Sequence, residues 1–394
     1  MKQIHFSVFN EPSAVDEVLK AFNQKRSAIA QVHGISWDHQ KDEMTAMALH
    51  GKSVFDVSQV GGPLVNDLVA MNALRPFTSS EITALGGVSA FSPIAWKNSR
   101  HTLDGSVFAI PWIIDSRAIY YWRDMLDKAG IEEATAFTSF ENMEQTFRRL
   151  QASGVESPWA LALSGGPLIQ PACTWIWGVG GDIVSEERVL KILDPKTLLG
   201  LRNFFDLYRY MPKSNQLLDF SYTYYELFAL RQTAATMGSL APFLSIKKKL
   251  PPDLQAQLGV ALAPGPFFIG SSSLVIWKNT RAAADAFALI QYLMSEEVQE
   301  NYCTLGGYLP ARLSVLAGPK YASDPHLSVF AQSAIQGRVF ANTKLSGLFE
   351  ELLSAAIKRI WLKIIANPEI ELEATILEEL QPIARRASLW GEHL

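Results

Sequence analysis

The chain has 394 residues, of which 48% are hydrophobic and 19% charged, and its formal net charge is −4. This length and apolar content can supply a large core and favour two or more lobes over a single domain. The sequence has no basic stripe, which argues against nucleic acid as a partner. It also has no uninterrupted apolar run of about 18 residues, so no membrane span is predicted.

Strands alternate with helices in the first third of the chain. Apolar runs typical of strands occupy residues 4–9, 29–35 and 54–60. A helix is expected to begin at Ser13, and a second to run from about Asp38 to Gly51. Strands separated by helices predict parallel β/α/β units with right-handed crossovers.

The rest of the chain carries shorter strands and ends in helices. Further strand-like runs occupy residues 107–114, 159–163, 234–237, 260–262 and 272–276. Pro111 interrupts the first of these, which suits an edge strand or a segment that crosses between lobes. A helix is predicted from about Arg281 to Met294, and the chain is almost entirely helical in pattern from Ser346 onward.

Charge and cysteine patterns indicate little special chemistry. Cys173 and Cys303 lie far apart without a metal-ligand spacing, so we expect buried free thiols and no metal or cofactor. The three lysines at 247–249 precede two prolines, which predicts a solvated loop. No apolar segment typical of a signal peptide follows Met1, so we expect either a cytoplasmic protein or the mature form of an exported one.

Common catalytic motifs are missing from the sequence. It contains no Gly-x-Ser-x-Gly, no Gly-x-x-x-x-Gly-Lys-Ser/Thr and no Gly-x-Gly-x-x-Gly, and its seven histidines form no His-x-x-x-His pair. We therefore interpret the chain as a binding protein and not an enzyme.

Eight segments, in order over nearly the whole chain, form a recognisable series. They are residues 104–112 (DGSVFAIPW), 115–121, 124–131, 177–182 (WGVGGD), 235–238, 270–276, 299–302 and 307–312 (GYLPAR). Together they resemble the extracellular solute-binding proteins of the maltose-binding type, which are the sugar receptors of ABC importers. One departure is that this chain has Ile269-Gly270 where the family commonly has two glycines before the serines.

The resemblance implies an α/β, two-lobe periplasmic-binding-protein fold of type II, with the ligand in the cleft between the lobes. The N-terminal lobe is expected to comprise residues 1–111 and 267–312, and the C-terminal lobe residues 112–266 and 313–394. It further implies a carbohydrate ligand captured by closure of the lobes, delivery to the permease subunits of an ABC transporter, and a monomer in the periplasm or at the extracellular surface.

A sugar site needs aromatic faces for C–H surfaces and polar side chains for hydroxyls. Trp37 and Asp38 match a family position that faces ligand, although Asp38 could instead be a helix N-cap. Glu11 follows the first strand, where it could also belong to the first turn of a helix. Gly61 ends the third strand and allows either close approach of a ligand to the backbone or a tight turn.

Further candidates lie near the expected crossings between lobes. Trp112 either contacts ligand or packs in the hinge, and Asp115 is a hydrogen-bond candidate. Gly270 and Ser271 could offer backbone N–H and hydroxyl groups. Arg312 either contacts ligand or forms a structural salt bridge.

The second lobe offers two pairs of candidates. One of Trp175 and Trp177 is predicted to stack on a sugar ring and the other to lie in the core. Tyr224 and Glu226 could also contact ligand, with an ordinary amphipathic helix as the alternative.

Two alternative functions stay open at this point. The same fold could bind another small solute, either a polyamine or a ferric ion held by Tyr224 and Tyr225. The chain could also be a carbohydrate-active enzyme such as a glycosidase, although abundant carboxylates do not identify an acid/base pair.

Overall fold

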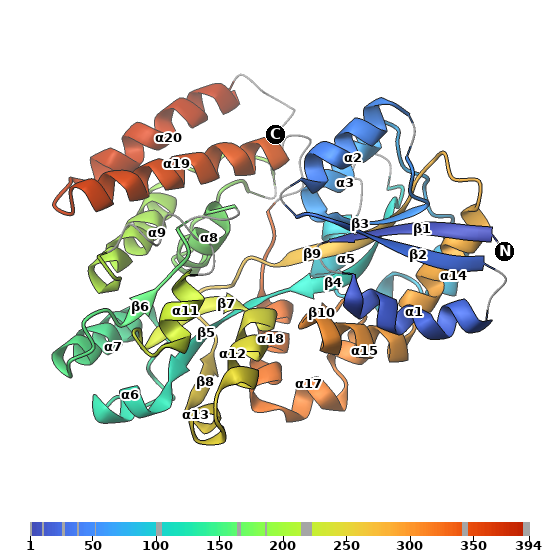
Figure 1. Ribbon diagram of the computed structural model, residues 1–394. Helices are drawn as coiled ribbons and strands as arrows, with labels where there is room; N and C mark the ends of the chain where they lie inside the picture. The colour runs from blue at the N-terminus through green and yellow to red at the C-terminus, as the bar shows by residue number, and fades with distance from the viewer. Residues whose placement is uncertain are drawn as a thin grey trace. The chain divides into compact units, whose positions relative to one another are not determined.

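The chain folds into two compact units, which Figure 1 shows as ribbons. The computed structural model describes residues 2–9, 12–25, 28–37, 39–51, 53–99, 105–163, 167–185, 187–213, 223–340 and 346–388. Unit 1 comprises Met1–Asp115 and Ile269–Asp324, and unit 2 comprises Ser116–Phe268 and Pro325–Leu394. The polypeptide therefore passes between the units three times.

The three crossings come later in the chain than the expected ends at residues 111, 266 and 312. Strand β4 (Ala109–Asp115) stays in unit 1 because it pairs with β9 (Gly270–Ile276) as far as Asp115 opposite Gly270. Helix α17 (Pro319–Ser323) also stays in unit 1, where Lys320 donates a hydrogen bond to Thr304 of α15 (Glu296–Gly306).

Unit 1 is built on a mixed six-stranded sheet with the order β10-β4-β9-β3-β1-β2. Its remaining strands are β1 (Lys2–Phe9), β2 (Ala28–Ile35), β3 (Val57–Gly61) and β10 (Leu309–Pro310). Strand β1 pairs in parallel with β2 and β3, which confirms the predicted β/α/β arrangement. Strands β9, β4 and β10 continue the sheet in antiparallel pairs.

Helices cover both faces of this sheet (Figure 1). They are α1 (Ser13–Lys25), α2 (Gln40–Leu49), α3 (Gly62–Ala70), α4 (Ser79–Ala84), α5 (Pro93–Ser99), α14 (Ala283–Leu293), α15 and α16 (Leu313–Leu316), with the short 3-10 turn η1 (Val88–Ala90). One core contains Ile4, Phe6 and Val8 with side chains of α1, α14 and α15. A second core contains Phe9 and Val60 with side chains of α2 and α3.

The three parallel strands end at one edge of the sheet. Phe9, the last residue of β1, lies opposite Ile35, the last residue of β2. Strand β3 begins at Val57 and not at the predicted residue 54, because Val54 is 69% exposed and makes no ladder contact. The loops that follow the strands therefore gather where ligands bind in sheets of this kind.

Pro111 lies inside β4 without breaking the sheet. Strand β4 is not an edge strand, but its pairing with β9 shifts register between Pro111 and Ile113. On its other side the two-residue strand β10 reaches only Ile113 and Ile114. A bulge and a short neighbour together tolerate the missing proline N–H.

Unit 2 is built on a smaller, four-stranded sheet with the order β6-β7-β5-β8. These strands are β5 (Arg117–Trp122), β6 (Trp159–Ala160), β7 (Ala235–Ser239) and β8 (Leu258–Ala261). The helical elements of unit 2 are α6 (Arg123–Lys128), α7 (Phe140–Ala152), α8 (Ile169–Gly178), α9 (Pro195–Asp206), η2 (Leu207–Tyr210), α11 (Thr223–Ala229), α12 (Leu240–Lys249), α13 (Pro252–Ala256), α18 (Pro325–Gln336), α19 (Ser346–Ala366) and α20 (Leu372–Ser388).

Aromatic side chains fill the core of unit 2. Helix α8 lies deep in this core, and every residue from Ala172 to Trp177 is buried. Trp361 of α19 packs edge-on against Phe204 and Phe205 of α9, with ring centroids 5.4 and 4.8 Å apart. The helical pattern predicted for the end of the chain is confirmed by α19 and α20, which lie side by side (Figure 1).

Two smaller expectations have different outcomes. Cys173 and Cys303 are buried and free, as predicted, and Cys173 belongs to unit 2 while Cys303 belongs to unit 1. The three lysines at 247–249 form the last turn of α12 and not a loop. Positive charge is favourable there because a helix ends in unpaired carbonyls.

Within the described residues, no helix is both long and apolar enough to cross a membrane.

Candidate functional site

The edge of the unit 1 sheet carries a half-exposed tryptophan. Trp37 follows β2, and its side chain is 47% exposed. Its ring meets that of Phe9 edge to face, with centroids 4.9 Å apart and an interplanar angle of 89°. This contact fixes one edge of the indole and leaves apolar ring surface open to a ligand.

Gln40 lies beside this ring and carries an unsatisfied acceptor. It is the first residue of α2 and is only 8% exposed. Its side-chain oxygen Oε1 is fully buried and accepts no hydrogen bond from the residues that the structure describes. A buried acceptor without a donor costs about 1–3 kcal/mol, so a donor from a ligand would be favoured here.

Gly61 lies close to both of these groups. A Cβ atom at this position would lie 3.8 Å from Gln40 Oε1 and 3.9 Å from the ring of Trp37. Both are ordinary van der Waals distances, so the backbone at Gly61 packs closely against the amide oxygen and the indole ring. Two predicted site residues, Trp37 and Gly61, thus come together around a third that the sequence did not reveal.

Three other predicted residues come together where β4 and β9 pair. Asp115 lies opposite Gly270, and Ile114 lies opposite Ser271. A Cβ atom at Gly270 would be 3.3 Å from the Cβ of Asp115, which is a tight contact. Glycine at this position therefore lets the strand ends approach closely at the first and second crossings.

In unit 2, a hydrogen-bond network of polar side chains lies next to Phe268, the last residue before the second crossing. The Arg117 guanidinium donates to the carbonyl of Phe268 at 3.1 Å and to Gln170 Oε1 at 2.9 Å. Gln170 Nε2 in turn donates to Glu350 Oε1 at 2.8 Å. The three side chains belong to β5, α8 and α19 and link them through one amide.

Glu350 is the buried, last member of this hydrogen-bond network, and the residue is 8% exposed. Burial raises the pKa of its carboxyl group, while the Gln170 hydrogen bond and the charge of Arg117 oppose the shift. A buried carboxylate held by one amide is poised to take hydrogen bonds from hydroxyl or ammonium groups.

A second set of polar contacts, centred on Arg338, holds the segment that ends at the second crossing. Arg338 donates from its backbone N–H to the carbonyl of Phe267 at 2.9 Å and from its guanidinium to Asp182 at 2.8 Å. The same guanidinium lies 4.8 Å from the ring centroid of Trp177, whose Nε1 donates to Asp182 at 3.0 Å. These contacts hold the segment against unit 2.

Comparison with known protein families shows which family the chain belongs to. Residues 17–329 match the family model of the bacterial extracellular solute-binding protein. The chain belongs to this family. The resemblance stated from the sequence is confirmed, and the family is one of binding proteins.

Solved structures show the fold of this solute-binding protein, and curated relatives match most of its sequence. The sugar-binding protein MalE from Xanthomonas citri superposes with a TM-score of 0.83 at 18% identity, covering 99% of this chain and 100% of MalE. This confirms the two-lobe α/β fold. A binding protein of Brucella abortus is 23% identical over 332 residues, 80% of this chain and 76% of its own length. The diacetylchitobiose-binding protein DasA of Streptomyces coelicolor is 20% identical over 313 residues, 75% of this chain and 69% of its own length.

Two predicted residues of the solute-binding protein have structural contacts within unit 1. Trp112 is 0% exposed and stacks on Tyr302, with centroids 4.3 Å apart and an interplanar angle of 3°. Arg312 donates to the carbonyls of Leu85 and Met294, each at 3.1 Å. These contacts favour packing for Trp112 and structural bonding for Arg312 over contact with a ligand.

The tryptophans of α8 lie in the core of unit 2. Trp175 is 1% exposed and packs against Phe140, Trp159 and Phe204. Trp177 is 5% exposed, and its ring stacks on Phe268. Neither ring offers a wide accessible face, so Trp37 replaces them as our candidate platform.

The remaining predicted residues divide into described and undescribed positions. On α11, the side chain of Tyr224 is 9% exposed and contacts the ring of Tyr225, whereas Glu226 is exposed. Glu11 and Asp38 lie outside the described residues. No group of three or more His, Cys, Asp or Glu side chains in the described part of the chain could hold a metal ion.

Proposed function

We propose that this solute-binding protein captures a carbohydrate outside the cytoplasmic membrane and delivers it to the permease subunits of an ABC importer. The observation that carries the proposal is the half-exposed ring of Trp37 beside Gln40 Oε1, which accepts no hydrogen bond from the residues that the structure describes. Sugars present apolar C–H faces together with hydroxyl donors, and this pair complements both.

The position of these groups supports a ligand role. They follow the carboxyl end of β2, at the end of the sheet where the parallel strands β1 and β3 also finish and where ligands bind in α/β sheets. Gly61, the last residue of β3, lies against both groups, because a Cβ atom there would be in van der Waals contact with Gln40 Oε1 and with the ring of Trp37.

We further propose that unit 2 contributes Gln170 and Glu350. Their side chains offer one amide and one carboxylate close to the residues where the chain crosses between units. Both can hydrogen-bond vicinal hydroxyls. Closure of the two units on the ligand is part of the proposal, as is typical of periplasmic binding proteins.

The relatives supply independent support for the ligand class. DasA is named as a diacetylchitobiose-binding protein, and MalE of Xanthomonas citri as a sugar-binding protein. Both names refer to carbohydrates, which agrees with the chemistry of the Trp37 and Gln40 pair. We propose that the chain shares this ligand class and acts without chemical turnover.

A thermal-shift screen against a panel of mono- and oligosaccharides tests the proposal. A ligand that binds only the folded state stabilises it by mass action and so raises the melting temperature. At a free ligand concentration of 100 times the dissociation constant, the gain in the free energy of unfolding is about 2.7 kcal/mol. At least one glycan should raise the melting temperature in a dose-dependent manner. A panel without a single hit, alongside a hit from a polyamine or ferric ion, would contradict the ligand class.

The same glycan tests for turnover. After overnight incubation at a hundredfold excess over protein, mass spectrometry should recover the glycan intact. Consumption of many glycan molecules per protein would make the chain an enzyme and overturn this part of the proposal.

A further inference from the structure

Helix α18 lies at the unit 2 side of the crossings between the units. The chain crosses at residues 115–116, 268–269 and 324–325. The third crossing leads directly into the helix, since Pro325 is the first residue of α18. The position of this helix therefore sets where the chain enters unit 2 at the third crossing.

Two hydroxyl groups bind the first crossing to the same helix. Ser116 Oγ donates to the carbonyl of Phe330 at 2.9 Å, and Ser333 Oγ donates to the carbonyl of Arg117 at 2.6 Å. Phe330 and Ser333 are three residues apart and so lie on the same side of α18. Ser116 and Ser333 are each 1% exposed, so both hydroxyl groups are buried.

The second crossing is bound to Arg117 and to the segment that follows α18. Arg338, two residues after the end of α18 at Gln336, donates from its backbone N–H to the carbonyl of Phe267 at 2.9 Å. The guanidinium of Arg117 donates to the carbonyl of Phe268 at 3.1 Å. Arg117 thus connects the first two crossings, because its carbonyl accepts from α18 and its side chain holds the last residue before the second crossing.

Helix α18 is itself fixed to other elements of unit 2. His326, in its first turn, lies with Nε2 3.1 Å from the carbonyl of Leu258 in β8 and with Nδ1 3.1 Å from Lys247 Nζ of α12. A carbonyl only accepts and an ammonium only donates, so one tautomer of the neutral ring satisfies both contacts. Any shift of the helix against the sheet would break them, which makes α18 a firm base for the crossings.

Arg117 also reaches the proposed ligand contacts of unit 2. The same guanidinium donates to Gln170 Oε1 at 2.9 Å, and Gln170 donates to Glu350 at 2.8 Å. A ligand that binds Gln170 or Glu350 therefore acts on a network that includes the side chain holding Phe268.

We propose that Arg117 is a positioning residue of the hinge, which together with α18 binds the three crossings to one another and couples them to Gln170. The inference rests on the proposed capture of a ligand by closure of the two units. Crossings that share one base turn together, so the hinge samples few arrangements and loses little conformational entropy when a ligand orders it. Without the guanidinium, the first and second crossings lose their direct link and the hinge samples a wider range.

Pulsed electron paramagnetic resonance measures this range without any ligand. Spin labels at Asp16→Cys in α1 and Glu373→Cys in α20, two exposed positions, report the distance between the units. Cys173 and Cys303 are buried and should remain unlabelled. We expect Arg117→Met to give a broader distribution of distances than the wild type, and an unchanged distribution would overturn the proposal.

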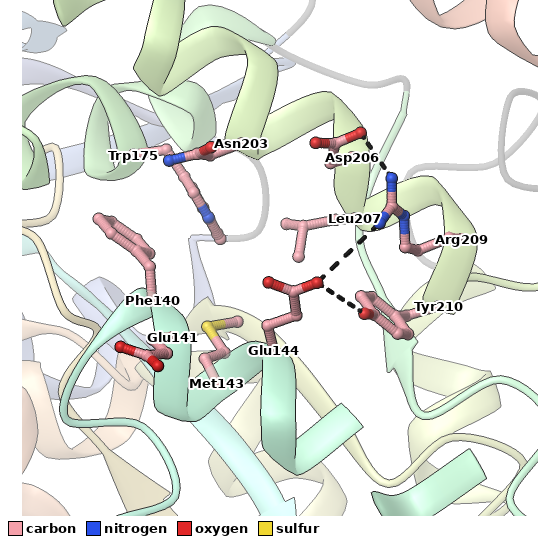
Figure 2. A pocket seen from close by; sticks show the side chains of 10 residues that line it. All are labelled: Phe140, Glu141, Met143, Glu144, Trp175, Asn203, Asp206, Leu207, Arg209 and Tyr210. Atoms are coloured by element: carbon pink, nitrogen blue, oxygen red, sulfur yellow. Dashed lines mark hydrogen bonds and ion pairs between the residues drawn. The ribbon is translucent and has the colours of Figure 1, made fainter. Parts of the chain in front are cut away.

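Arg209→Met is the matched control within unit 2. This guanidinium lines a cavity of about 260 Å³, where it binds Asp206 of α9 at 3.0 Å and lies 3.9 Å from Glu144 of α7 (Figure 2). Neither partner is next to a crossing, so this variant should keep the wild-type distribution of distances. Equal broadening in the two arginine variants would indicate a general loosening of unit 2 and refute the role of Arg117.

Ser333→Ala tests the link to α18 separately and decides the question if Arg117→Met does not fold. Its control is Thr146→Val, which also removes a buried hydroxyl that donates to a carbonyl, here that of Ala136 at 3.0 Å. The two variants should lose similar stability, but only Ser333→Ala should broaden the distribution. A wild-type distribution in Ser333→Ala, or the same broadening in Thr146→Val, would refute the shared base.

Glycans that raise the melting temperature in the panel of mono- and oligosaccharides test the coupling to the ligand. By calorimetry, Ser333→Ala should bind each of them about fivefold more weakly than the wild type, although Ser333 is not among the proposed ligand contacts. Wild-type affinity would overturn the coupling. A panel without a hit counts against the proposed function alone, because the ligand-free distances still decide whether Arg117 and α18 hold the hinge.

Discussion

The side-chain amide of Gln170 donates a 2.8 Å hydrogen bond to the buried carboxylate of Glu350 and thereby joins α8 to α19. An unfolded glutamate ionises near pH 4.5, and burial raises the pKa of Glu350 in the folded chain. The folded state thus holds this proton more tightly than the unfolded state. The contribution of Glu350 to stability is greatest below about pH 4.5 and decreases as the pH rises through the raised pKa.

Glu350→Gln removes this ionisation and keeps an oxygen that can accept from Gln170. We expect the variant to melt at a higher temperature than the wild type at pH 8, with a smaller difference at pH 5. Differential scanning calorimetry at both pH values provides the measurement. Glu373→Gln, at an exposed position of α20, is the control and should melt like the wild type. A lower melting temperature for Glu350→Gln at pH 8 would contradict the assigned burial cost.

A histidine pair predicts a pH dependence of the opposite sign. His5 Nδ1 and His33 Nε2 are 3.1 Å apart, so one ring donates to the other. Burial, with a contribution from His5, lowers the pKa of His33 below 6.5. The unfolded chain therefore binds this proton first, and stability is lost as the pH falls through about 6.5 towards the folded pKa. Urea denaturation between pH 8 and 5 should show this loss, and His33→Gln should reduce it.

Trp37→Ala tests the proposed platform. An aromatic stack is worth about 0.5–1.5 kcal/mol beyond the buried area. Together with lost burial we expect roughly 2 kcal/mol, or about thirtyfold weaker carbohydrate affinity, by calorimetry. Stability should change by about 1 kcal/mol or less, since half of the side chain is exposed. Leu49→Ala removes another exposed apolar side chain of unit 1 and should leave affinity unchanged. Equal losses in the two variants would rule out a specific platform.

Gln40→Met separates ligand binding from folding. Methionine has a similar length and removes an acceptor that takes no hydrogen bond from the described part of the chain. We expect equal or greater stability in denaturant, by up to about 1–3 kcal/mol, together with about tenfold weaker carbohydrate binding. A variant that is less stable and binds normally would show that Gln40 serves the fold and not the ligand.

The sequence predicted the parts of the fold that depend on local pattern. The apolar runs of β1 and β2 alternate with the helical period of α1, so their parallel pairing follows from short connections and handedness. The end of β4 was less predictable. Its last residues stay in unit 1 through pairing with β9, more than 150 residues later, and no local signal marks such a partner.

The site was less predictable because burial depends on which elements pack together. Gln40 and Glu350 are polar residues on helices, which usually face solvent, and only the tertiary packing around α2 and between α8 and α19 buries them. Trp175 and Trp177 were ambiguous for a related reason. Helix α8 is buried on all sides over this stretch, so its sequence has no polar face that would indicate which ring is accessible.

The place of β9 in the sheet has a consequence for biosynthesis. Strand β9 lies between β3 and β4, yet it is encoded after the whole of Ser116–Phe268, the first of the two segments of unit 2. In a nascent chain that has left the ribosome only as far as Phe268, strand β9 is missing. The edges of β3 and β4 that later pair with β9 therefore still have unpaired N–H and C=O groups. The N-terminal strands must wait for Gly270–Ile276 to emerge, by which time most of unit 2 has been synthesised. Unit 1 can therefore be completed only when Asp324 has emerged, and unit 2 only when Pro325–Leu394 has followed, so two incomplete units coexist during synthesis.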